Sequence, residues 1–440
     1  MKIPEILLVE SHHKPGSLAK ILQVIGDCGL VVEHLNAIRR DQDKTIWEIT
    51  LEMDEDVHYG LYEKIEALPN ARLMGKSDRV FNRHRGGKIH MHSRLPLATL
   101  QELRDIYTPG VARVCLAIRD NPWLAREYTY LPNSVAIVTN GTAILGLGDI
   151  GPVAGLPVME GKAALFDKFV GLSGIPILLD EKDPDRLIDI IMAIAPSFGA
   201  IQLEDIAAPA CFQVEAALRE RLAIPVLHDD QHGTAVVTLA ALMSVAKRVG
   251  KDLTDSVVGQ IGLGSAGIGI ARLLKAYGAD KVVGADLNEA ALQRLESMGG
   301  RRAELPELMA ECDVVIACTG VRGLIRPEWV REGQIVFALS NPDAEIEPNV
   351  ALARGAAYAA DGKGINNALG FPGLFKGALQ ANATGFTDDM LFAAARCLSD
   401  LAPEDELVPD CLNPEVHQAV AEAVAAAAPV KPVGQEKAGP

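Results

Sequence analysis

The sequence predicts an α/β protein in which helices cover both faces of parallel sheets. The first observation is periodicity. From about residue 97 onward, short apolar segments of strand length alternate with longer segments of helical spacing, which is typical of parallel sheets. The second is size, because 440 residues are enough for two or three domains of roughly 100–200 residues each. The third is composition, since 49% hydrophobic and 23% charged residues can fill cores of that size.

Two series of strands are expected in this part of the chain. They cover 135–138, 176–179, 200–203 and 225–227 in the first series, and 257–261, 281–285, 313–317, 335–339 and 357–360 in the second. Helices are expected over 160–171 and 231–250. We therefore predict one domain over 97–230 and another over 231–425 that ends in helices. Residues 426–440 are Ala/Pro/Lys-rich and are predicted to be disordered.

Residues 1–80 are predicted to form a separate small domain. Strands are expected at 6–10, 31–39, 45–53 and 71–75, and helices from Ser17 to about Cys28 and over 57–68. Ser17 is expected to cap the first helix and Gly29 to end it. The resulting order βαββαβ is the ferredoxin-like arrangement. Residues 81–96 are basic and contain glycine, and they are predicted to be a linker rather than a nucleic-acid-binding patch.

This first segment resembles an ACT domain. The most specific part of the resemblance is the first strand followed by Lys14-Pro15-Gly16-Ser17-Leu18, which opens the helix. ACT domains commonly sense amino acids or other small ligands, so the resemblance implies a small-molecule effector and allosteric regulation at this domain. A plain α/β oligomerisation module is the alternative that the residues leave open.

The charge balance and the cysteines exclude several classes of protein. The formal net charge of -16 and the pI of about 5.1 predict that neither nucleic acid nor an anionic membrane is a partner. The 7 cysteines include no Cys-x-x-Cys pair, which argues against a disulfide framework or a structural zinc site and fits a reducing compartment. Neither a signal peptide nor an apolar run of the ~20 residues that span a bilayer is found. A cytoplasmic protein is expected.

A glycine-rich segment predicts a dinucleotide site. It reads Gly262-Leu263-Gly264-Ser265-Ala266-Gly267, follows an expected strand and opens a helix to about Tyr277. The first glycine makes the turn, the second lets the backbone approach a pyrophosphate, and the helix N-terminus offers free N–H groups. Asp286 ends the next strand, where it would accept hydrogen bonds from ribose hydroxyls and repel a 2′-phosphate. A Rossmann-like domain that prefers NAD over NADP is therefore predicted.

Two acidic pairs, Glu204-Asp205 and Asp229-Asp230, each follow an expected apolar strand. Ligands of open α/β sheets bind beyond the carboxyl ends of strands, so several carboxylates are expected in one crevice, where they would repel one another without a cation. Oxygen ligands suit Mg²⁺ or Mn²⁺. Helix capping and surface salt bridges are the alternative for either pair alone. The flanking His228 and His232 are expected to hydrogen-bond locally rather than to bind the metal.

Together, these motifs closely resemble the malic enzymes in their compact bacterial form. The matching segments are Tyr107-Thr108-Pro109-Gly110-Val111-Ala112, Ile144-Leu145-Gly146-Leu147-Gly148-Asp149-Ile150-Gly151, Glu160-Gly161-Lys162-Ala163, Leu203-Glu204-Asp205, His228-Asp229-Asp230-Gln231-His232-Gly233-Thr234-Ala235, Ser340-Asn341-Pro342 and Asn366-Asn367-Ala368-Leu369-Gly370-Phe371-Pro372-Gly373. The resemblance implies oxidative decarboxylation of malate to pyruvate and CO₂, with NAD as hydride acceptor, Mg²⁺ or Mn²⁺ in the site, and at least a dimer.

The resemblance also implies roles for single residues. Lys162 would be the base that takes the proton from the substrate hydroxyl, and Tyr107 the acid that protonates the enolate. The remaining implied roles are metal binding by Glu204, Asp205 and Asp230, tuning of Lys162 by Asp229, and contacts of Asn341 and Asn367 with substrate and nicotinamide. One departure is Ala143, because larger malic enzymes carry an arginine there that grips a substrate carboxylate. Another group must hold that carboxylate in this chain.

The expected chemistry has rivals. Lys162 must be neutral to accept a proton, and nearby cations and desolvation are expected to lower its pKa. Hydride would pass from C2 of malate to NAD⁺, and the oxaloacetate formed would lose CO₂ to leave an enolate that the metal stabilises. Conversion of malate to lactate and simple decarboxylation of oxaloacetate are alternatives from the same site. A ligand-sensing regulator on a degenerate α/β scaffold is the alternative from another class. Whether Tyr107 serves its own subunit or a neighbour's stays open.

Overall fold

The computed structural model describes residues 2–54, 60–76, 79–144, 146–341 and 343–429. The chain divides into two compact units, Met1–Lys88 and Ile89–Pro440, and the boundary falls within the predicted connector 81–96. Residues 430–440 of the predicted tail and residues 57–59 of a predicted helix lie outside the described residues. No described helix is both long and apolar enough to cross a membrane.

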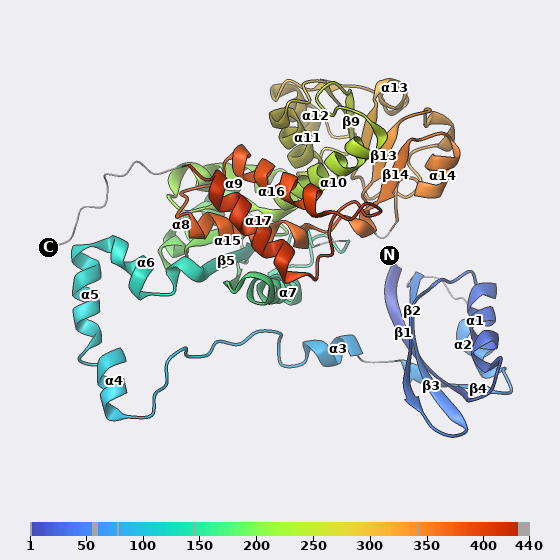
Figure 1. The fold of residues 1–440 in the computed structure, drawn as a ribbon, viewed down its shortest axis with the longest axis horizontal. Helices are drawn as coiled ribbons and strands as arrows, with labels where there is room; N and C mark the ends of the chain where they lie inside the picture. The colour runs from blue at the N-terminus through green and yellow to red at the C-terminus, as the bar shows by residue number, and fades with distance from the viewer. Residues whose placement is uncertain (1, 55–59, 77–78, 145, 342, 430–440) are drawn as a thin grey trace. The chain divides into compact units, whose positions relative to one another are not determined.

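The first unit is a four-stranded antiparallel sheet with two helices packed against one face (Figure 1). Its elements are β1 (Lys2–His12), α1 (Ser17–Asp27), β2 (Val32–Arg40), β3 (Lys44–Asp54), α2 (Leu61–Glu66), β4 (Ala71–Lys76) and α3 (Arg79–His84). The sheet order is β2-β3-β1-β4. The core alternates along the strands, so that Leu7 and Val9 of β1 face Ile21 and Ile25 of α1. The expected order βαββαβ is confirmed.

Two expectations for this unit are wrong in detail. Ser17 does not cap α1, because the cap position is Gly16, whose φ of 82° only glycine adopts easily, and no side chain caps the helix. Ser17 is instead the first helical residue and is buried. The short helix α3, Arg79–His84, also extends into the first residues of the predicted linker 81–96. Gly29 follows α1 with φ of 73°, as expected of a residue that ends a helix.

The second unit contains two parallel sheets. The first has the order β6-β5-β7-β8. The elements up to this sheet's end are α4 (Leu100–Ile106), α5 (Val111–Asp120), α6 (Ala125–Tyr128), β5 (Ser134–Thr139), α7 (Pro152–Val170), β6 (Ser173–Leu178), α8 (Pro184–Ile194), β7 (Ala200–Leu203), α9 (Ala210–Arg221) and β8 (Val226–His228). One face packs against α7, and the other against α8 and α9. All four expected strands are present.

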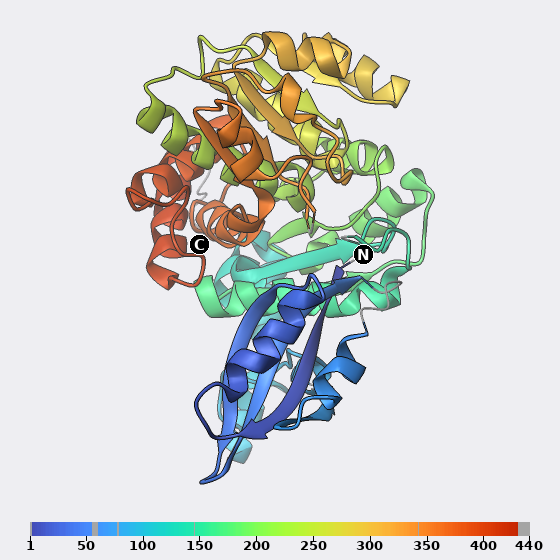
Figure 2. The same ribbon diagram turned by 90° about the vertical axis from the view of Figure 1, so that its right-hand side faces the viewer.

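The second sheet has the order β11-β10-β9-β12-β13-β14, and all its strands are parallel (Figure 2). The elements are α10 (Thr234–Val249), β9 (Val258–Ile261), α11 (Ser265–Tyr277), β10 (Val282–Ala285), α12 (Glu289–Ser297), β11 (Arg301–Arg302), α13 (Leu305–Glu311), β12 (Val314–Ala317), β13 (Ile335–Ala338), α14 (Pro348–Ala353), β14 (Tyr358–Asp361), α15 (Phe371–Gln380), α16 (Asp388–Leu401) and α17 (Pro414–Ala427). One face packs against α11, and the other against α13 and α14.

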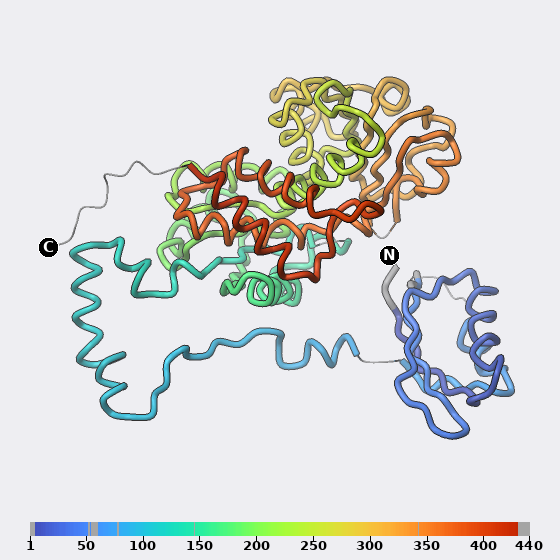
Figure 3. The backbone as a smooth tube through the Cα atoms, viewed as in Figure 1, coloured from blue at the N-terminus to red at the C-terminus, as the bar shows by residue number. Residues whose placement is uncertain are grey.

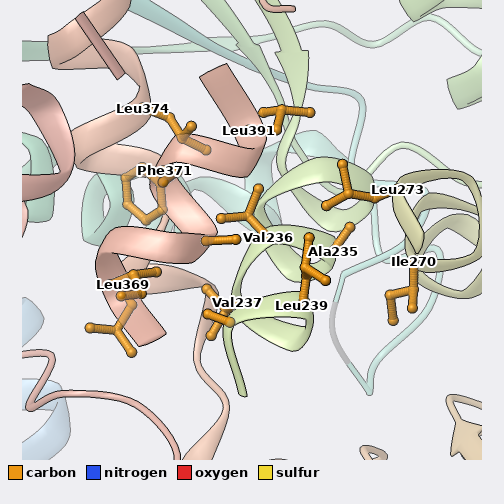
Figure 4. Close-up of a cluster of buried hydrophobic side chains, with 14 of the residues drawn as sticks. Ala235, Val236, Val237, Leu239, Ile270, Leu273, Leu369, Phe371, Leu374 and Leu391 are labelled. Atoms are coloured by element: carbon orange, nitrogen blue, oxygen red, sulfur yellow. The ribbon is translucent and has the colours of Figure 1, made fainter. Parts of the chain in front are cut away.

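Helix α10 joins the two sheets through a shared core. Twelve consecutive residues of this helix, 235–246, are buried. Figure 4 shows Val236 and Leu239 of α10 between Phe371 of α15 and Leu273 of α11. A helix that is apolar on every side is expected at the centre of a large domain rather than at its surface.

Helix α7 differs most from the sequence-based expectation. It begins at Pro152, eight residues before the predicted start at 160, so Lys162 lies in its second half and not at its start. Proline is well suited to the first helical turn, where its missing N–H is not needed, and Gly151 precedes it. Pro157 lies inside the helix, a position that usually ends one. The buried face of α7 outweighs this local cost.

Candidate active site

The two acidic pairs lie at neighbouring strand ends. β7 and β8 are adjacent and parallel, with Leu203 opposite His228. Glu204-Asp205 follows β7, and Asp229-Asp230 opens a π-helical turn, Asp229–Gly233, between β8 and α10. The prediction that both pairs share one edge of a sheet is confirmed.

Three of these carboxylates form a compact group. Oxygens of Glu204, Asp205 and Asp230 lie within 4.8 Å of one another. The Asp205 backbone N–H donates to Asp230 Oδ2 at 3.2 Å. Gln202 Nε2 donates to Glu204 Oε2 at 2.6 Å and orients that carboxylate. Carboxylate oxygens gathered in this way suit a hard divalent cation such as Mg²⁺ or Mn²⁺.

Burial and mutual repulsion disfavour three free anions in this group. Burial and the charges of Glu204 and Asp230 raise the pKa of Asp205 to about 8. Burial raises the pKa of Asp230 to about 6, against the lowering effect of Lys162. The buried Asp205 Oδ2 has no hydrogen-bond partner among the described residues. A cation would satisfy this oxygen and relieve the repulsion, so the residues fit the expected metal.

Lys162 of α7 lies beside the carboxylate group. Its side chain is 11% exposed, and its Nζ lies 2.5 Å from Asp229 Oδ2 and 3.2 Å from Glu204 Oε1. The same Nζ lies over the Phe371 ring, 4.6 Å from the centroid. Asp229 Oδ2 also accepts a hydrogen bond from Asn367 Nδ2 at 2.9 Å. The structure thus joins the lysine, its carboxylate partner and an amide into one buried network.

Opposing effects set the pKa of Lys162. Burial favours the neutral amine, but the charges of Asp229 and Glu204 favour the ammonium and prevail, so the pKa lies above its usual range. The protein's own groups therefore do not produce the expected lowering of this pKa, because the charges around Nζ are carboxylates. Burial also raises the pKa of Asp229 to about 6, despite its ammonium partner.

The expected local hydrogen bonding of the two histidines beside the second acidic pair is not met by His228, because neither of its ring nitrogens has a hydrogen-bond partner among the described residues. His232 Nε2 lies 2.8 Å from Glu215 Oε1 of α9. His228 is fully buried, and its backbone N–H donates to the same glutamate at 3.1 Å. Among the described residues, neither histidine belongs to the group that can share one metal ion. Glu215 therefore braces the turn that carries Asp229 and Asp230.

The glycine-rich segment forms the tight turn between β9 and α11. Gly262 has a φ of 82°, and a Cβ there would lie 2.6 Å from the Cys318 carbonyl oxygen. A Cβ on Gly267 would lie 1.9 Å from the Gly262 carbonyl oxygen. Helix α11 begins at Ser265, so its free N–H groups lie at the carboxyl edge of the sheet. The strand, turn and helix of a dinucleotide site are all present.

Asp286 follows β10 at the same edge. Its Oδ2 accepts the Leu263 backbone N–H at 2.6 Å, and its Oδ1 accepts the Asn288 backbone N–H at 2.7 Å. The carboxylate thus fixes the glycine turn and the start of α12. Each oxygen keeps a further lone pair with which it can accept a hydroxyl group.

Known protein families match most of the second unit. Residues 87–219 match "Malic enzyme, N-terminal domain", residues 229–322 match "D-isomer specific 2-hydroxyacid dehydrogenase, NAD binding domain", and residues 288–433 match "Malic enzyme, NAD binding domain". A Bacillus subtilis (strain 168) protein named NAD-dependent malic enzyme 1 is 51% identical over 96% of this chain and 97% of its own length. The chain belongs to the malic enzyme family.

Another relative and a solved structure agree with this assignment. The NAD-dependent malic enzyme of Geobacillus stearothermophilus is 40% identical over 94% of this chain and 91% of its own. The crystal structure of malic enzyme from Pyrococcus horikoshii Ot3 has a TM-score of 0.76 at 39% identity, covering 79% of this chain and 89% of that one. The α/β malic enzyme fold with a Rossmann-like NAD-binding domain is confirmed.

Tyr107 is not brought into the buried network of this malic enzyme. It ends α4 and is 66% exposed. Among the described residues, no hydrogen bond joins its side chain to Lys162 or to the carboxylates. Neither α4 nor α5 buries any residue. In Figure 3 this stretch of the chain runs apart from the helices that pack around β5. The phenol that the family resemblance implies as an acid therefore stands apart from the implied base.

Asn341 and Ala143 each donate a hydrogen bond to a backbone carbonyl oxygen, and that of Ala143 reaches Asp205. Asn341 follows β13, is exposed, and donates from Nδ2 to the Gly362 carbonyl oxygen at 3.2 Å. The Ala143 backbone N–H donates to the Asp205 carbonyl oxygen at 3.0 Å. Asp205 adopts a left-handed φ of 53°, a strained conformation that is common at functional sites.

Sequence reasoning missed several residues that support the site. Phe371 lies in a recognised motif, but a phenylalanine in an apolar helix gives no sign that it covers a lysine. Gln202 lies inside a buried strand, where its contact with Glu204 becomes visible only in the fold. Glu215 and Glu345 contact the site's loops across 13 and 26 residues of sequence, so no local motif marks them.

Proposed function

We propose that this chain is an NAD-dependent malic enzyme that converts L-malate to pyruvate and CO₂. The observation that carries the proposal is the buried Lys162 between Asp229 and the group of three carboxylates. Oxidation of a hydroxy acid requires a proton acceptor next to a metal ion. Glu204, Asp205 and Asp230, called the metal-type group from here on, can hold such an ion. The glycine turn after β9 supplies the matching nucleotide site.

The residues divide the chemistry between them. A divalent cation held by Glu204, Asp205 and Asp230 would polarise the C2 oxygen of malate and lower the energy of the enolate left after CO₂ departs. Bound NAD⁺ would accept the hydride from C2. Lys162 takes the proton of the C2 hydroxyl, while Asp229 and Asn367 hold its amine in place. Phe371 keeps water from the amine.

Lys162 needs to be neutral for this step, although Asp229 and Glu204 raise its pKa in the metal-free protein. Glu204 belongs both to the metal-type group and to the surroundings of Lys162. Asp230, another member of the group, also favours the ammonium, so a cation that neutralises Glu204 and Asp230 would leave Asp229 as the main carboxylate that does so. Metal binding and deprotonation of Lys162 are therefore coupled through Glu204.

We propose that Tyr107 acts as the acid in the site of a second copy of the chain. The arm formed by α4 and α5 buries none of its residues in its own chain. Its exposed apolar side chains include Leu100, Leu103, Ile106, Val114 and Leu116. Monomeric proteins rarely expose an apolar surface of this kind, and a self-complementary contact with a second copy would cover it. Such a contact would deliver Tyr107 to the partner's Lys162.

Mixing two inactive variants tests this arrangement. Tyr107→Phe removes the acid, and Lys162→Ala removes the base. If the site is shared, random exchange makes half the dimers mixed, each with one intact site, so about a quarter of wild-type pyruvate formation returns. If each chain uses its own tyrosine, the mixture stays as inactive as its components. Pyruvate formation after co-expression distinguishes the two results.

The cofactor preference is proposed to follow from Asp286. Its carboxylate is held in place by the Leu263 and Asn288 backbone N–H groups at the edge where a ribose would lie. A carboxylate there accepts hydrogen bonds from a 2′-hydroxyl and repels a 2′-phosphate. NAD is therefore the proposed cofactor rather than NADP.

The first unit is proposed to be an ACT-like regulatory domain. Its support is the order βαββαβ with sheet order β2-β3-β1-β4, and the turn at Gly16. A Cβ at Gly16 would have no atom within 4 Å, so the backbone there is open to a ligand. Regulation requires that this ligand bind two states of the protein with different affinity.

Removing the first unit tests this regulatory role. A chain of residues 89–440 is expected to keep basal malate oxidation and to lose any response to an effector, because the second unit carries its own core and the whole candidate site. Initial rates of both chains are measured with each of the common amino acids at millimolar concentration. A response that persists in the shortened chain would place the regulatory site in residues 89–440.

The experiment that tests the proposed function is product analysis with malate as the sole substrate. Pyruvate together with NADH supports the proposal. Lactate without net NADH, or turnover of oxaloacetate alone, would assign the site to one of the two rival reactions. No turnover together with ligand binding would favour a regulator.

A further inference from the structure

Glu345, a buried glutamate after β13 of the second sheet, has no part in the proposed proton and hydride transfers. β12 and β13 are neighbouring parallel strands, and the loops that follow them begin at Cys318 and Leu339. In open parallel sheets, a ligand binds in the crevice beyond these strand ends. Glu345 lies behind both loops and is 0% exposed.

Glu345 accepts hydrogen bonds from both loops. Its Oε1 accepts the Thr319 backbone N–H at 2.6 Å, the Thr319 hydroxyl at 2.8 Å and the Ser340 hydroxyl at 2.5 Å. Its Oε2 accepts the Ser340 backbone N–H at 3.4 Å. Among the described residues, no lysine, arginine or histidine forms an ion pair with Glu345. Its carboxylate oxygens are therefore held by the donors of these two loops.

Further hydrogen bonds extend this network across the strand ends. The Ser340 hydroxyl oxygen accepts the Gly320 backbone N–H at 2.8 Å and so links the two loops directly. The Ile325 backbone N–H donates to the Glu345 carbonyl oxygen at 3.0 Å and fixes the glutamate's own backbone. The next residue, Asn341, donates to the Gly362 carbonyl oxygen after β14. Three consecutive strand ends are thus tied together.

We propose that Glu345 is a positioning residue for the nicotinamide cofactor. It fixes the loops after β12 and β13, and through Ser340 it sets the place of Asn341 at the crevice. The inference rests on the proposed use of NAD, but it assigns Glu345 to cofactor binding and not to the proton transfer at Lys162. The geometry fits this role because β12 pairs with β9, whose turn carries the glycine motif, and β13 pairs with β12 on the other side.

The test is a titration of the full chain with NADH, in which the fluorescence of NADH reports its binding. Glu345→Gln keeps the size of the side chain but turns an NH₂ group toward donors. The variant leaves a buried donor of the loops after β12 and β13 without an acceptor, which costs enough free energy to disorder them. Because NADH binding needs these loops ordered, it should weaken by about tenfold or more. We expect the Kd for NADH and the KM for NAD⁺ to rise by this factor, with the KM for malate changed less than twofold.

Thr319 offers a second pair of variants in case Glu345→Gln folds poorly. Thr319→Val has the same shape but lacks the hydroxyl that donates to Glu345, and it should weaken NADH binding. Thr319→Ser keeps the hydroxyl and should bind NADH as the wild type does. If Thr319 only packed against its neighbours, Thr319→Ser would not bind NADH better than Thr319→Val.

Gln334 provides the matched control. It is buried at the opposite end of β13, where its Nε2 donates to the Met309 and Cys312 carbonyl oxygens at 3.1 and 2.8 Å. Gln334→Leu should lower the melting temperature and leave the Kd for NADH unchanged. Unchanged NADH binding in Glu345→Gln and Thr319→Val, or equal weakening in Gln334→Leu, would overturn the proposal. Because binding is measured without malate, either result is independent of the reaction that the enzyme catalyses.

Discussion

Replacing Lys162 with alanine is expected to lower kcat for malate oxidation by about 10³-fold, the usual contribution of a positioned acid or base. The Lys162 amine lies within hydrogen-bond distance of both Asp229 and Glu204. From there it can accept a proton from a hydroxyl bound at the metal-type group. Without it the substrate hydroxyl keeps its proton, and hydride transfer from C2 is disfavoured. The measurement is the initial rate of NADH formation at saturating malate.

The matched control is Lys168→Ala on the same helix. Lys168 pairs with Asp167 at the surface and is 78% exposed, so its loss should leave kcat unchanged. NADH binding by Lys162→Ala shows whether the variant has folded. Turnover near the wild-type rate in a folded Lys162→Ala protein would remove Lys162 from the role of base.

Asp230→Asn is expected to weaken Mn²⁺ binding by about 100-fold or more, because it removes one of three carboxylates that can share the ion. The same change should raise the melting temperature of the metal-free protein. The reason is that the Asp230 charge contributes to the pKa of about 8 at Asp205, which reflects unfavourable burial and repulsion in the group. Added Mn²⁺ should then stabilise the wild type far more than the variant.

Asp167→Asn is the control for this experiment, since Asp167 is exposed on α7 and lies outside the group. It should match the wild type in Mn²⁺ affinity and in melting temperature with and without the ion. Wild-type Mn²⁺ affinity in Asp230→Asn would show that the ion binds elsewhere. A lower melting temperature of the metal-free variant would show that Asp230 stabilises the fold rather than strains it.

The sequence predicts the parts of this protein that depend on local pattern. Alternation of apolar segments identifies all nine expected strands of the second unit, because a buried parallel strand is apolar along its whole length. The glycine motif predicts its own turn, since Gly262 needs a positive φ. The start of α7 could not be predicted in the same way, because tertiary packing holds Pro157 inside a helix.

The site shows the same division between local and distant contacts. The acidic pairs are predicted to meet because each follows a strand, and parallel strands end at one edge. The pKa of Lys162 could not be predicted from sequence, because its sign depends on whether Asp229 and Glu204 or cations lie nearest to Nζ. Glu345 gives no sequence signal, since Thr319 lies 26 residues away from it. Contacts between distant loops are visible only in the folded chain.

The measurement that tests the central proposal most directly is the stoichiometry of the reaction. The purified chain is supplied with L-malate, Mn²⁺ and NAD⁺, and NADH and pyruvate are measured in the same sample, with NADP⁺ in a parallel sample. We expect one pyruvate for each NADH, no turnover after the divalent cation is chelated, and a slower reaction with NADP⁺. NADH formed without pyruvate, or pyruvate formed without NADH, would contradict the assignment of oxidative decarboxylation to this site.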